Sequence, residues 1–395
     1  MVDEIVFPKD FLFGTSTSSF QIETPVDHQL KGLIGKDGTK LVETIEHEKH
    51  RYSDASIIAK LGNAYRFSLD WGRLQTYPFE RFEGNVVKEY RIFLNRLKKK
   101  GVKLMLVLHH FANPNWFEHH GSWLNSKAID MYLDYVEQVH HHFGDLVDYY
   151  NTFNEPGVFA LHTHMTGFFP PYKRMKLFAV RKILNNMAKA SNKAYDMLKD
   201  NSSDVQVGFA KSILNPLPVN FAGGITALGY EIFFIDYILK KFSKHDYIGI
   251  NYYGYMPMGL IPFSRPDNKN KFDGLRKEHD DLWIYDPKDL KKIIMKLHRK
   301  YKKPIIITEN GYSGENDNRR LSFIADHLKS IHEAMDEGIV VKGYFYWSTF
   351  DNYELYLGKT FRFGLVHVNY KTMKRTLKGS AKFYSKLSKY KVLEV

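Results

Sequence analysis

Eight short apolar runs, separated by longer amphipathic stretches, are the sequence feature that most restricts the fold of this chain. Several runs are apolar at consecutive positions, as in residues 104–108 (LMLVL) and 305–307 (III). Such runs are typical of parallel strands that are buried on both faces by helices. We therefore predict strands at residues 11–13, 64–67, 102–108, 149–153, 205–209, 247–250, 304–308 and 341–346. Helical patterns separate them at residues 88–100, 128–143, 175–199, 230–242, 287–301, 319–337 and from 380 onward.

Two α/β architectures fit this alternation: a closed (β/α)8 barrel and an open, doubly wound sheet. They differ in where polar residues gather, because an open sheet collects them near one switch point, whereas a barrel gathers them after many strands. Here they follow six predicted strands, at Arg66, His109-His110, Asn154-Glu155, Asn251-Tyr252-Tyr253, Glu309-Asn310 and Trp347. We therefore predict a single (β/α)8 TIM barrel, forming one catalytic domain over residues 1–395, with polar loops at 27–48 and 262–281 above it.

Composition excludes several classes of protein. The 395 residues contain no cysteine, which rules out disulfide scaffolds, zinc ribbons, iron–sulfur proteins and thiol enzymes. The net charge of +13 comes mostly from dispersed lysines, so we expect a solvated surface and no nucleic-acid partner. The N-terminus is acidic, and no continuous apolar run reaches the length of a membrane span. We expect a soluble, cytoplasmic protein without a membrane partner, whose oligomeric state is open.

Two glutamates, Glu155 and Glu309, each come directly after an apolar strand, in the segments TFNEP (152–156) and ITENG (307–311). In a barrel both side chains would point into the same cavity at the carboxyl ends of the strands. Two facing carboxyl groups can hydrolyse a glycoside, since one protonates the leaving oxygen while the other attacks or activates water. The alternative is that each glutamate caps the following helix or forms an ion pair. Trp347 and Glu354, at a third strand end, favour a catalytic site over this alternative.

Further motifs accompany these two glutamates. The segments 154–156 (NEP) and 308–311 (TENG) match the two catalytic motifs of glycoside hydrolase family 1, the β-glucosidase and β-galactosidase family, which the whole chain resembles. Other segments that resemble the family follow in its order: 11–23 (FLFGTSTSSFQIE), 65–68 (YRFS), 110–111 (HF), 249–253 (GINYY), 343–348 (GYFYWS), 351–354 (DNYE) and 362–366 (RFGLV).

The resemblance implies a retaining β-glycosidase that hydrolyses glucosides, galactosides or fucosides through a covalent glycosyl-enzyme intermediate, without cofactor or metal. It implies that Glu155 is the acid/base and Glu309 the nucleophile. Arg66 would keep Glu309 ionised, and Asn251 would support the site. The implied substrate-binding residues are Gln21, His110, Asn154, Tyr253, Trp283, Trp347 and Glu354. Trp347 would form the floor under the sugar and Trp283 a platform for the leaving group. The expected partner is a small oligosaccharide or an aryl or alkyl glycoside.

The sequence also departs from the family. Leu355 stands where the family usually has tryptophan, so an indole N–H toward the sugar is missing, and we hypothesise relaxed selectivity among sugars.

Two alternatives use the same barrel: a transglycosylase, and a carbohydrate-binding pseudoenzyme, which would have lost a glutamate. Neighbouring histidines occur at 140–142, in a helical pattern, and at 162 and 164, which could share a strand face. We interpret them as structural and predict no metal site.

Overall fold

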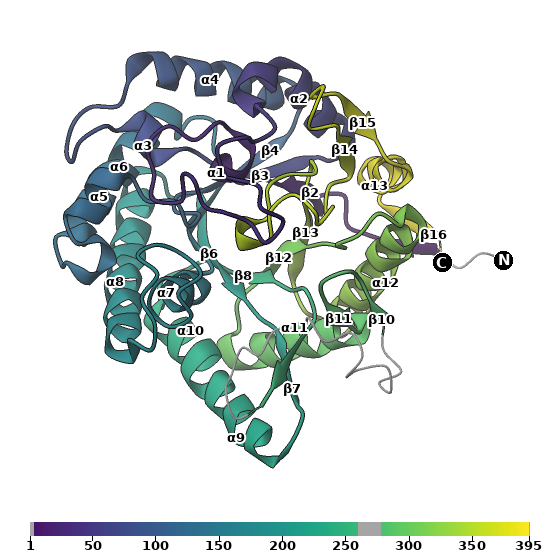
Figure 1. Ribbon diagram of the computed structural model, residues 1–395. Helices are drawn as coiled ribbons and strands as arrows, with labels where there is room; N and C mark the ends of the chain where they lie inside the picture. The colour runs from purple at the N-terminus through teal and green to yellow at the C-terminus, as the bar shows by residue number, and fades with distance from the viewer. Residues whose placement is uncertain (1–3, 260–277, 395) are drawn as a thin grey trace.

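Eight parallel strands close into a barrel that is ringed by helices in the computed structural model, which describes residues 4–259 and 278–394 (Figure 1). The strands follow one another around the barrel in the order β12-β13-β2-β3-β4-β5-β6-β8, with β8 pairing with β12 to close it. The predicted (β/α)8 fold is confirmed. The barrel strands are β2 (Leu12–Ser16), β3 (Ala64–Ser68), β4 (Lys103–Val107), β5 (Tyr149–Asn154), β6 (Gln206–Ser212), β8 (Tyr247–Asn251), β12 (Ile305–Asn310) and β13 (Val341–Trp347).

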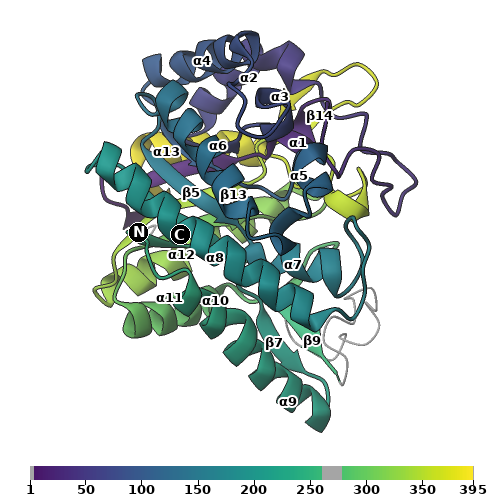
Figure 2. The same cartoon turned by 90° about the vertical axis from the view of Figure 1, so that its left-hand side faces the viewer.

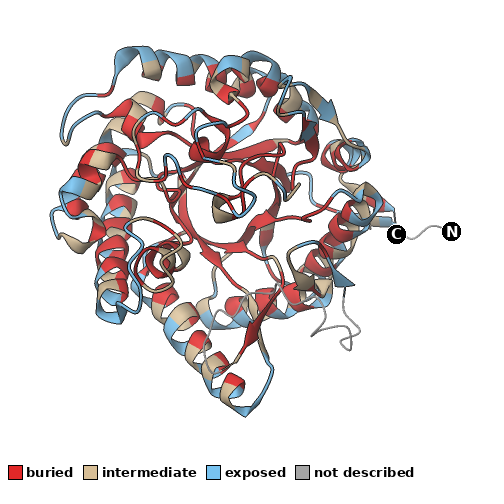
Figure 3. Ribbon diagram, in the orientation of Figure 1, coloured by how far each residue is buried: buried red, intermediate tan, exposed pale blue. Residues whose placement is uncertain are grey.

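The helices cover the outside of the barrel, and Figure 3 shows buried residues on their inner sides. The longer ones are α2 (His47–Leu61), α4 (Gly84–Lys99), α6 (Ala128–Phe143), α8 (Leu177–Asn201), the continuous run α9 (Phe221–Gly229), η2 (Tyr230–Asp236) and α10 (Tyr237–Lys241), then α11 (Pro287–Tyr301), α12 (Asp317–Asp336) and α13 (Gly379–Tyr390). Shorter helices at the strand ends are α1 (Ser19–Ile22), α3 (Trp71–Leu74), α5 (Asn115–His119), η1 (Ser122–Leu124), α7 (Pro156–His164) and η4 (Leu355–Leu357).

In residues 4–259 and 278–394, eight further strands form four two-stranded sheets outside the barrel. The pair β1 (Glu4–Val6) and β16 (Val392–Glu394) joins the two ends of the described chain. The other pairs are β7 (Asn215–Pro218) with β9 (Tyr255–Met258), β10 (Glu278–His279) with β11 (Ile284–Tyr285), and β14 (Val366–Val368) with β15 (Arg375–Leu377).

The structure differs from the sequence-based expectations in several details. The sequence pattern did not predict α2, which takes over the last two residues of the predicted loop 27–48. His162 and His164 lie on α7 rather than on a strand, so they do not share a strand face. The predicted loop 262–281 lies, up to residue 277, outside the described residues. The helices that were predicted are present, with bounds that differ by a few residues.

The interior of the barrel is plugged at the end away from the pocket described below. Leu12, Ala64, Met105, Tyr247, Ile306 and Phe345 form a cluster of buried side chains separate from the main core. Because these residues come from six different strands, they can meet only inside the barrel. Gly14 makes room for this packing, since a Cβ atom there would lie 2.2 Å from the Phe345 ring. The barrel is therefore a packed core, and a cavity is left only above it.

The run α9–η2–α10 extends beyond the outline of the barrel, together with β7 (Figures 1 and 2). Among the described residues, Phe221–Lys241 is one helical stretch long and apolar enough to cross a membrane by length and composition. Only 33% of its most apolar window is buried in the fold. The sequence contains no continuous apolar run of that length because Thr226, Glu231 and Asp236 interrupt it.

Candidate active site

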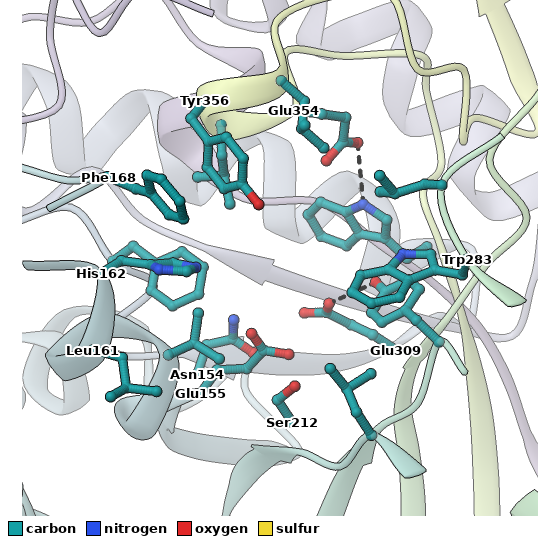
Figure 4. Close-up of a pocket in the computed structure, with 18 of the residues that line it drawn as sticks. Asn154, Glu155, Leu161, His162, Phe168, Ser212, Trp283, Glu309, Glu354 and Tyr356 are labelled. Atoms are coloured by element: carbon teal, nitrogen blue, oxygen red, sulfur yellow. Dashed lines mark hydrogen bonds between the residues drawn. The ribbon is translucent and has the colours of Figure 1, made fainter. Parts of the chain in front are cut away.

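A cavity of about 240 Å³ opens at the carboxyl ends of the barrel strands (Figure 4). This volume lies below the roughly 300–1,000 Å³ of pockets for drug-sized ligands, so it suits a small ligand. The cavity brings together the residues predicted to touch substrate, which lie far apart in the sequence. They are Gln21, His110, Asn154, Glu155, Tyr253, Trp283, Glu309, Trp347 and Glu354. Arg66 and Asn251 lie behind this lining and hold it in place.

Glu155 occupies a sharp junction between β5 and α7. Its backbone has φ 45° and ψ 55°, a left-handed conformation that is uncommon for a residue with a side chain. The Glu155 N–H donates to the carbonyl of Ala210 on β6 at 2.8 Å, and Pro156 begins the helix. The Glu155 side chain does not cap α7; its Oε1 accepts a hydrogen bond from Asn251 Nδ2 at 2.9 Å. The helix-capping alternative is therefore wrong for Glu155.

Glu309, at the end of β12, is held by a cation and a phenol. Arg66 Nη1 lies 2.5 Å from Glu309 Oε1, and both side chains are almost fully buried. The Tyr253 hydroxyl donates to Glu309 Oε2 at 2.9 Å. Burial raises the pKa of Glu309, whereas Arg66 and the Tyr253 hydrogen bond lower it. Both contacts stabilise the charged form of this carboxyl group.

A hydrogen-bond network joins the two glutamates through Asn154. Asn154 Oδ1 accepts from Arg66 Nη2 at 2.6 Å and from Asn251 Nδ2 at 3.0 Å. Asn154 Nδ2 donates to His110 Nε2 at 3.0 Å. Thr308 Oγ1 donates to Asn251 Oδ1 at 2.6 Å, which fixes the orientation of that amide. The network places Arg66 and Asn251 as positioning residues, while one amide hydrogen of Asn154 remains for a ligand.

The environment of Glu155 contrasts with that of Glu309, because no arginine among the described residues forms an ion pair with it. Burial, followed by the negative charge of Glu309, raises the pKa of Glu155 to about 7. Two buried carboxyl groups in one cavity do not ionise together easily. Since Arg66 stabilises the charge on Glu309, the geometry favours a charged Glu309 beside a protonated Glu155 near neutral pH.

Lys211 on β6 is a charged neighbour that the sequence analysis missed. It is completely buried, and its Nζ donates to the backbone carbonyl of Ser212 and lies 4.2 Å from the ring centroid of Phe234. Burial lowers the pKa of Lys211 to about 7, and its charge lowers the pKa of Glu155. The only signal in the sequence was a lysine inside the otherwise apolar strand 207–211 (VGFAK).

Glu354 forms the opposite side of the cavity. Its Oε1 accepts from Trp347 Nε1 at 3.2 Å, drawn as a dashed line in Figure 4, and its Oε2 accepts from Gln21 Nε2 at 3.3 Å. Gln21 Nε2 also donates to the carbonyl of Tyr353 at 2.7 Å. Burial raises the pKa of Glu354 to about 8. This carboxyl group is therefore preorganised by two donors and can share hydroxyl hydrogen bonds with a polar ligand.

Three rings complete the polar part of the cavity. His110 Nε2 accepts from Asn154, so its proton lies on Nδ1, which has no hydrogen-bond partner among the described residues. The rings of His110 and Trp347 lie 5.9 Å apart. Trp283 stacks beside Tyr253, with ring centroids 6.2 Å apart and an interplanar angle of 27°. The four ring side chains predicted from the sequence, His110, Tyr253, Trp283 and Trp347, therefore all line the site.

The remaining lining is largely apolar and comes from the segments that follow β5, β6, β8 and β13. Tyr356 stacks on Phe168 at 4.8 Å, and Figure 4 shows its hydroxyl directed into the cavity. His162 lines the cavity from α7, whereas the sequence analysis suggested that it could share a strand face with His164. The sequence did contain a signal for α7, because Pro156 is favoured in the first turn of a helix. The apolar lining residues are Val158, Leu161, Phe168, Leu214, Phe234, Met256, Leu282, Leu355, Leu357 and Phe363.

No group of three or more His, Asp or Glu side chains in the described part of the chain could hold a metal ion. A (β/α)8 barrel with a charged and a protonated carboxyl group in one sugar-sized cavity defines a glycoside hydrolase.

Comparisons with known proteins agree with this class. The model of "Glycosyl hydrolase family 1" matches residues 3–223 and 236–392, and the chain belongs to this family. It is 29% identical to Beta-glucosidase A of Acetivibrio thermocellus, over 98% of this chain and 99% of that protein. A beta-glycosidase from Pyrococcus horikoshii has a TM-score of 0.89 and 31% identity, covering 100% of this chain and 97% of that one.

A third relative was solved with an inhibitor. The beta-glucosidase from Thermotoga maritima in complex with deoxynojirimycin has a TM-score of 0.86 and 25% identity, covering 98% of this chain and 100% of that one. The protein is accordingly a retaining β-glycosidase, which confirms the reaction class predicted from the sequence.

Proposed function

We propose that Glu309 is the nucleophile and Glu155 the acid/base of this glycosidase. The ion pair between Arg66 and Glu309 is the observation that supports this assignment, because it stabilises a charged carboxylate in one of the two positions. Within the described part of the chain Glu155 forms no such ion pair, and its pKa of about 7 keeps it protonated below neutral pH. A nucleophile must be ionised before it attacks, and an acid must hold its proton until the aglycone leaves.

In the first step a Glu309 carboxylate oxygen attacks the anomeric carbon, and the bond from that carbon to the aglycone oxygen breaks. Glu155 gives its proton to that oxygen, so the aglycone leaves as an alcohol. In the second step Glu155 takes a proton from water, and the water oxygen attacks the anomeric carbon. The ester bond to Glu309 breaks, and both carboxyl groups return to their first states. Two displacements give retention of configuration.

The same contacts explain how Glu155 changes role between the steps. The charge of Glu309 is the second cause of the raised pKa of Glu155. When Glu309 carries the sugar as an ester, that charge is absent, so the pKa of Glu155 falls. Glu155 is then ionised when it must accept a proton from water.

The sugar occupies the polar side of the cavity in this proposal. Trp347 supports the apolar face of the ring, and Gln21, His110 and Glu354 contact its hydroxyl groups. Asn154 uses its remaining amide hydrogen on the hydroxyl next to the anomeric carbon, and Trp283 contacts the leaving group.

We further propose that the aglycone is an aryl or alkyl group. The side chains beyond the two carboxyl groups, including Leu161, Phe168, Leu214 and Phe234, are mostly apolar. An apolar aglycone buries its surface against them, whereas a sugar would place some of its hydroxyl groups against apolar side chains, which costs free energy.

Azide rescue of alanine variants tests the two roles. With a dinitrophenyl β-glucoside, whose leaving group needs no proton, Glu155→Ala should turn over with azide and release the β-glucosyl azide. Glu309→Ala should release the α-glucosyl azide, because azide enters from the face that the nucleophile has left. Glu118→Ala is the control, since this partly buried glutamate is hydrogen-bonded to Asn113 outside the cavity; it should hydrolyse the substrate normally. Exchanged anomers would mean that the two roles are exchanged.

A further inference from the structure

The two most exposed large apolar side chains of the described residues are Phe178 and Phe221, each 88% exposed. Phe178 is in the first turn of α8, and Phe221 begins α9. These segments follow β5 and β6, which are neighbouring strands, so both helices begin on the rim where the pocket opens. Apolar side chains this exposed on one rim indicate an interaction surface.

An exposed stripe runs along α9 into η2. Phe221, Ile225, Leu228 and Ile232 are spaced by four, three and four residues, which places them on one side of the helix. Their exposed fractions are 88, 64, 62 and 47%. The opposite side is packed: Gly223 and Ala227 are buried, and Tyr230 and Phe234 line the pocket. The helix is therefore fixed to the barrel by one side and cannot cross a membrane while the protein is folded.

The neighbouring segment, residues 171–178, is exposed at every position and combines apolar and basic side chains. Lys173, Arg174 and Lys176 alternate with Tyr172, Met175 and Leu177 in it, and residues 165–178 contain no acidic residue. No ion pair of these three cations occurs within the described residues. We call residues 171–178 together with the exposed stripe of α9 and η2 the rim patch.

The rim patch borders the active site directly. His162 and Phe168 line the pocket just before the basic segment, and Leu214 and Tyr230 line it on either side of α9. Figures 1 and 2 both show α9 projecting beyond the barrel. The family model leaves residues 224–235 unmatched, and these include much of the stripe.

We propose that the rim patch docks the protein on the surface of an anionic lipid bilayer, with the mouth of the pocket facing that surface. Apolar side chains next to unpaired lysine and arginine are the composition of segments that lie in a membrane interface. A symmetric dimer is less compatible, since it would bring the same three cations of both copies into one interface. The docking surface is independent of the roles proposed for Glu155 and Glu309. It replaces the expectation of no membrane partner, which considered only spanning segments.

Co-sedimentation of the full-length protein with vesicles tests this surface. Vesicles of phosphatidylcholine mixed with phosphatidylserine should bind the protein, vesicles of phosphatidylcholine alone should bind it far less, and added salt should weaken binding. The triple variant Lys173→Gln, Arg174→Gln, Lys176→Gln should lower the partition coefficient about a hundredfold, at roughly fivefold for each cation. Phe178→Ser with Phe221→Ser should lower it by at least tenfold. Hydrolysis of soluble 4-nitrophenyl β-glucoside should stay unchanged in both variants.

The matched control is Val340→Ser with Tyr390→Ser. These side chains are 52 and 61% exposed and precede β13 and β16, on the opposite rim of the barrel. Their loss should leave vesicle binding unchanged. The proposal is wrong if the wild type binds neither kind of vesicle, or if the control weakens binding as much as the rim variants do. It is also wrong if the rim variants change only self-association in sedimentation velocity, which would make the patch an interface between copies.

Discussion

Replacing Arg66 by methionine should separate the charge of this residue from its volume at the centre of the site. Arg66 contacts Glu309 at 2.5 Å and Asn154 at 2.6 Å, and it is fully buried. Removing one partner of a buried ion pair typically costs about 3–5 kcal/mol. The Tyr253 hydrogen bond to Glu309 remains, so we use the lower value. A loss of about 3 kcal/mol in stabilisation of the charged nucleophile corresponds to a roughly 100-fold lower kcat/KM.

The sign of the pH dependence follows from the same contact. Without Arg66, the pKa of Glu309 rises further, because burial is then opposed only by hydrogen bonds. The acid limb of kcat/KM, which reports ionisation of the nucleophile in the free enzyme, should therefore move to higher pH. The basic limb, set by Glu155 near its pKa of about 7, limits how much activity returns as the pH rises.

The assay is kcat/KM for 4-nitrophenyl β-glucoside across the pH range of the folded protein, with circular dichroism at each pH as a check of the fold. Arg51→Met is the matched control, since Arg51 is also buried and pairs with Glu23 at 3.1 Å, away from the cavity. It should lower the melting temperature and leave both limbs in place. An acid limb that stays unmoved in Arg66→Met would refute the reasoning, even if the rate fell.

Two further predictions concern the neighbours of the reaction centre. Lys211→Met should move the basic limb of kcat/KM to higher pH, because the buried cation lowers the pKa of Glu155. The control is Lys240→Met, which removes an exposed lysine on α10 and should leave the limb in place. An unmoved limb in Lys211→Met would contradict the effect of Lys211 on Glu155. Leu355→Trp should raise kcat/KM threefold to tenfold for one sugar among glucosides, galactosides and fucosides, since one hydrogen bond contributes about 0.5–1.5 kcal/mol. Leu355→Phe, whose ring lacks the N–H, is the control. Relaxed selectivity would be excluded if the wild type preferred one of these sugars over the others by more than about a thousandfold.

Most of the barrel could be predicted because its strands are continuous apolar runs. The helix α2 was missed for a physical reason: its inward side carries charged residues that hide the apolar periodicity. Arg51 and Asp54 are buried there, in ion pairs with Glu23 and Arg375 that are distant in the sequence. Such pairs become visible only when the chain is folded.

The site was predictable in part. The strand-end positions of Glu155, Glu309 and Trp347 follow from the sequence, since parallel strands end on the same rim. The apolar wall from α7 was missed although Pro156 signals a helix start, because the segment 158–161 (VFAL) is apolar on every side and shows no helical periodicity. The exposed stripe of α9 has the composition of a core helix, so only its packing against the barrel reveals which side faces outward. The cytoplasmic location stays a prediction.

Trapping the covalent intermediate tests the central assignment most directly. A 2-deoxy-2-fluoro β-glucoside with a good leaving group forms the ester quickly and hydrolyses it slowly, because fluorine destabilises both positively charged transition states. Intact mass spectrometry should show one sugar added per chain, and peptide mapping should place it on Glu309, in the peptide that contains residues 307–311. The Glu309→Gln variant should gain no mass. An adduct on Glu155, or full inactivation without any adduct, would contradict the account.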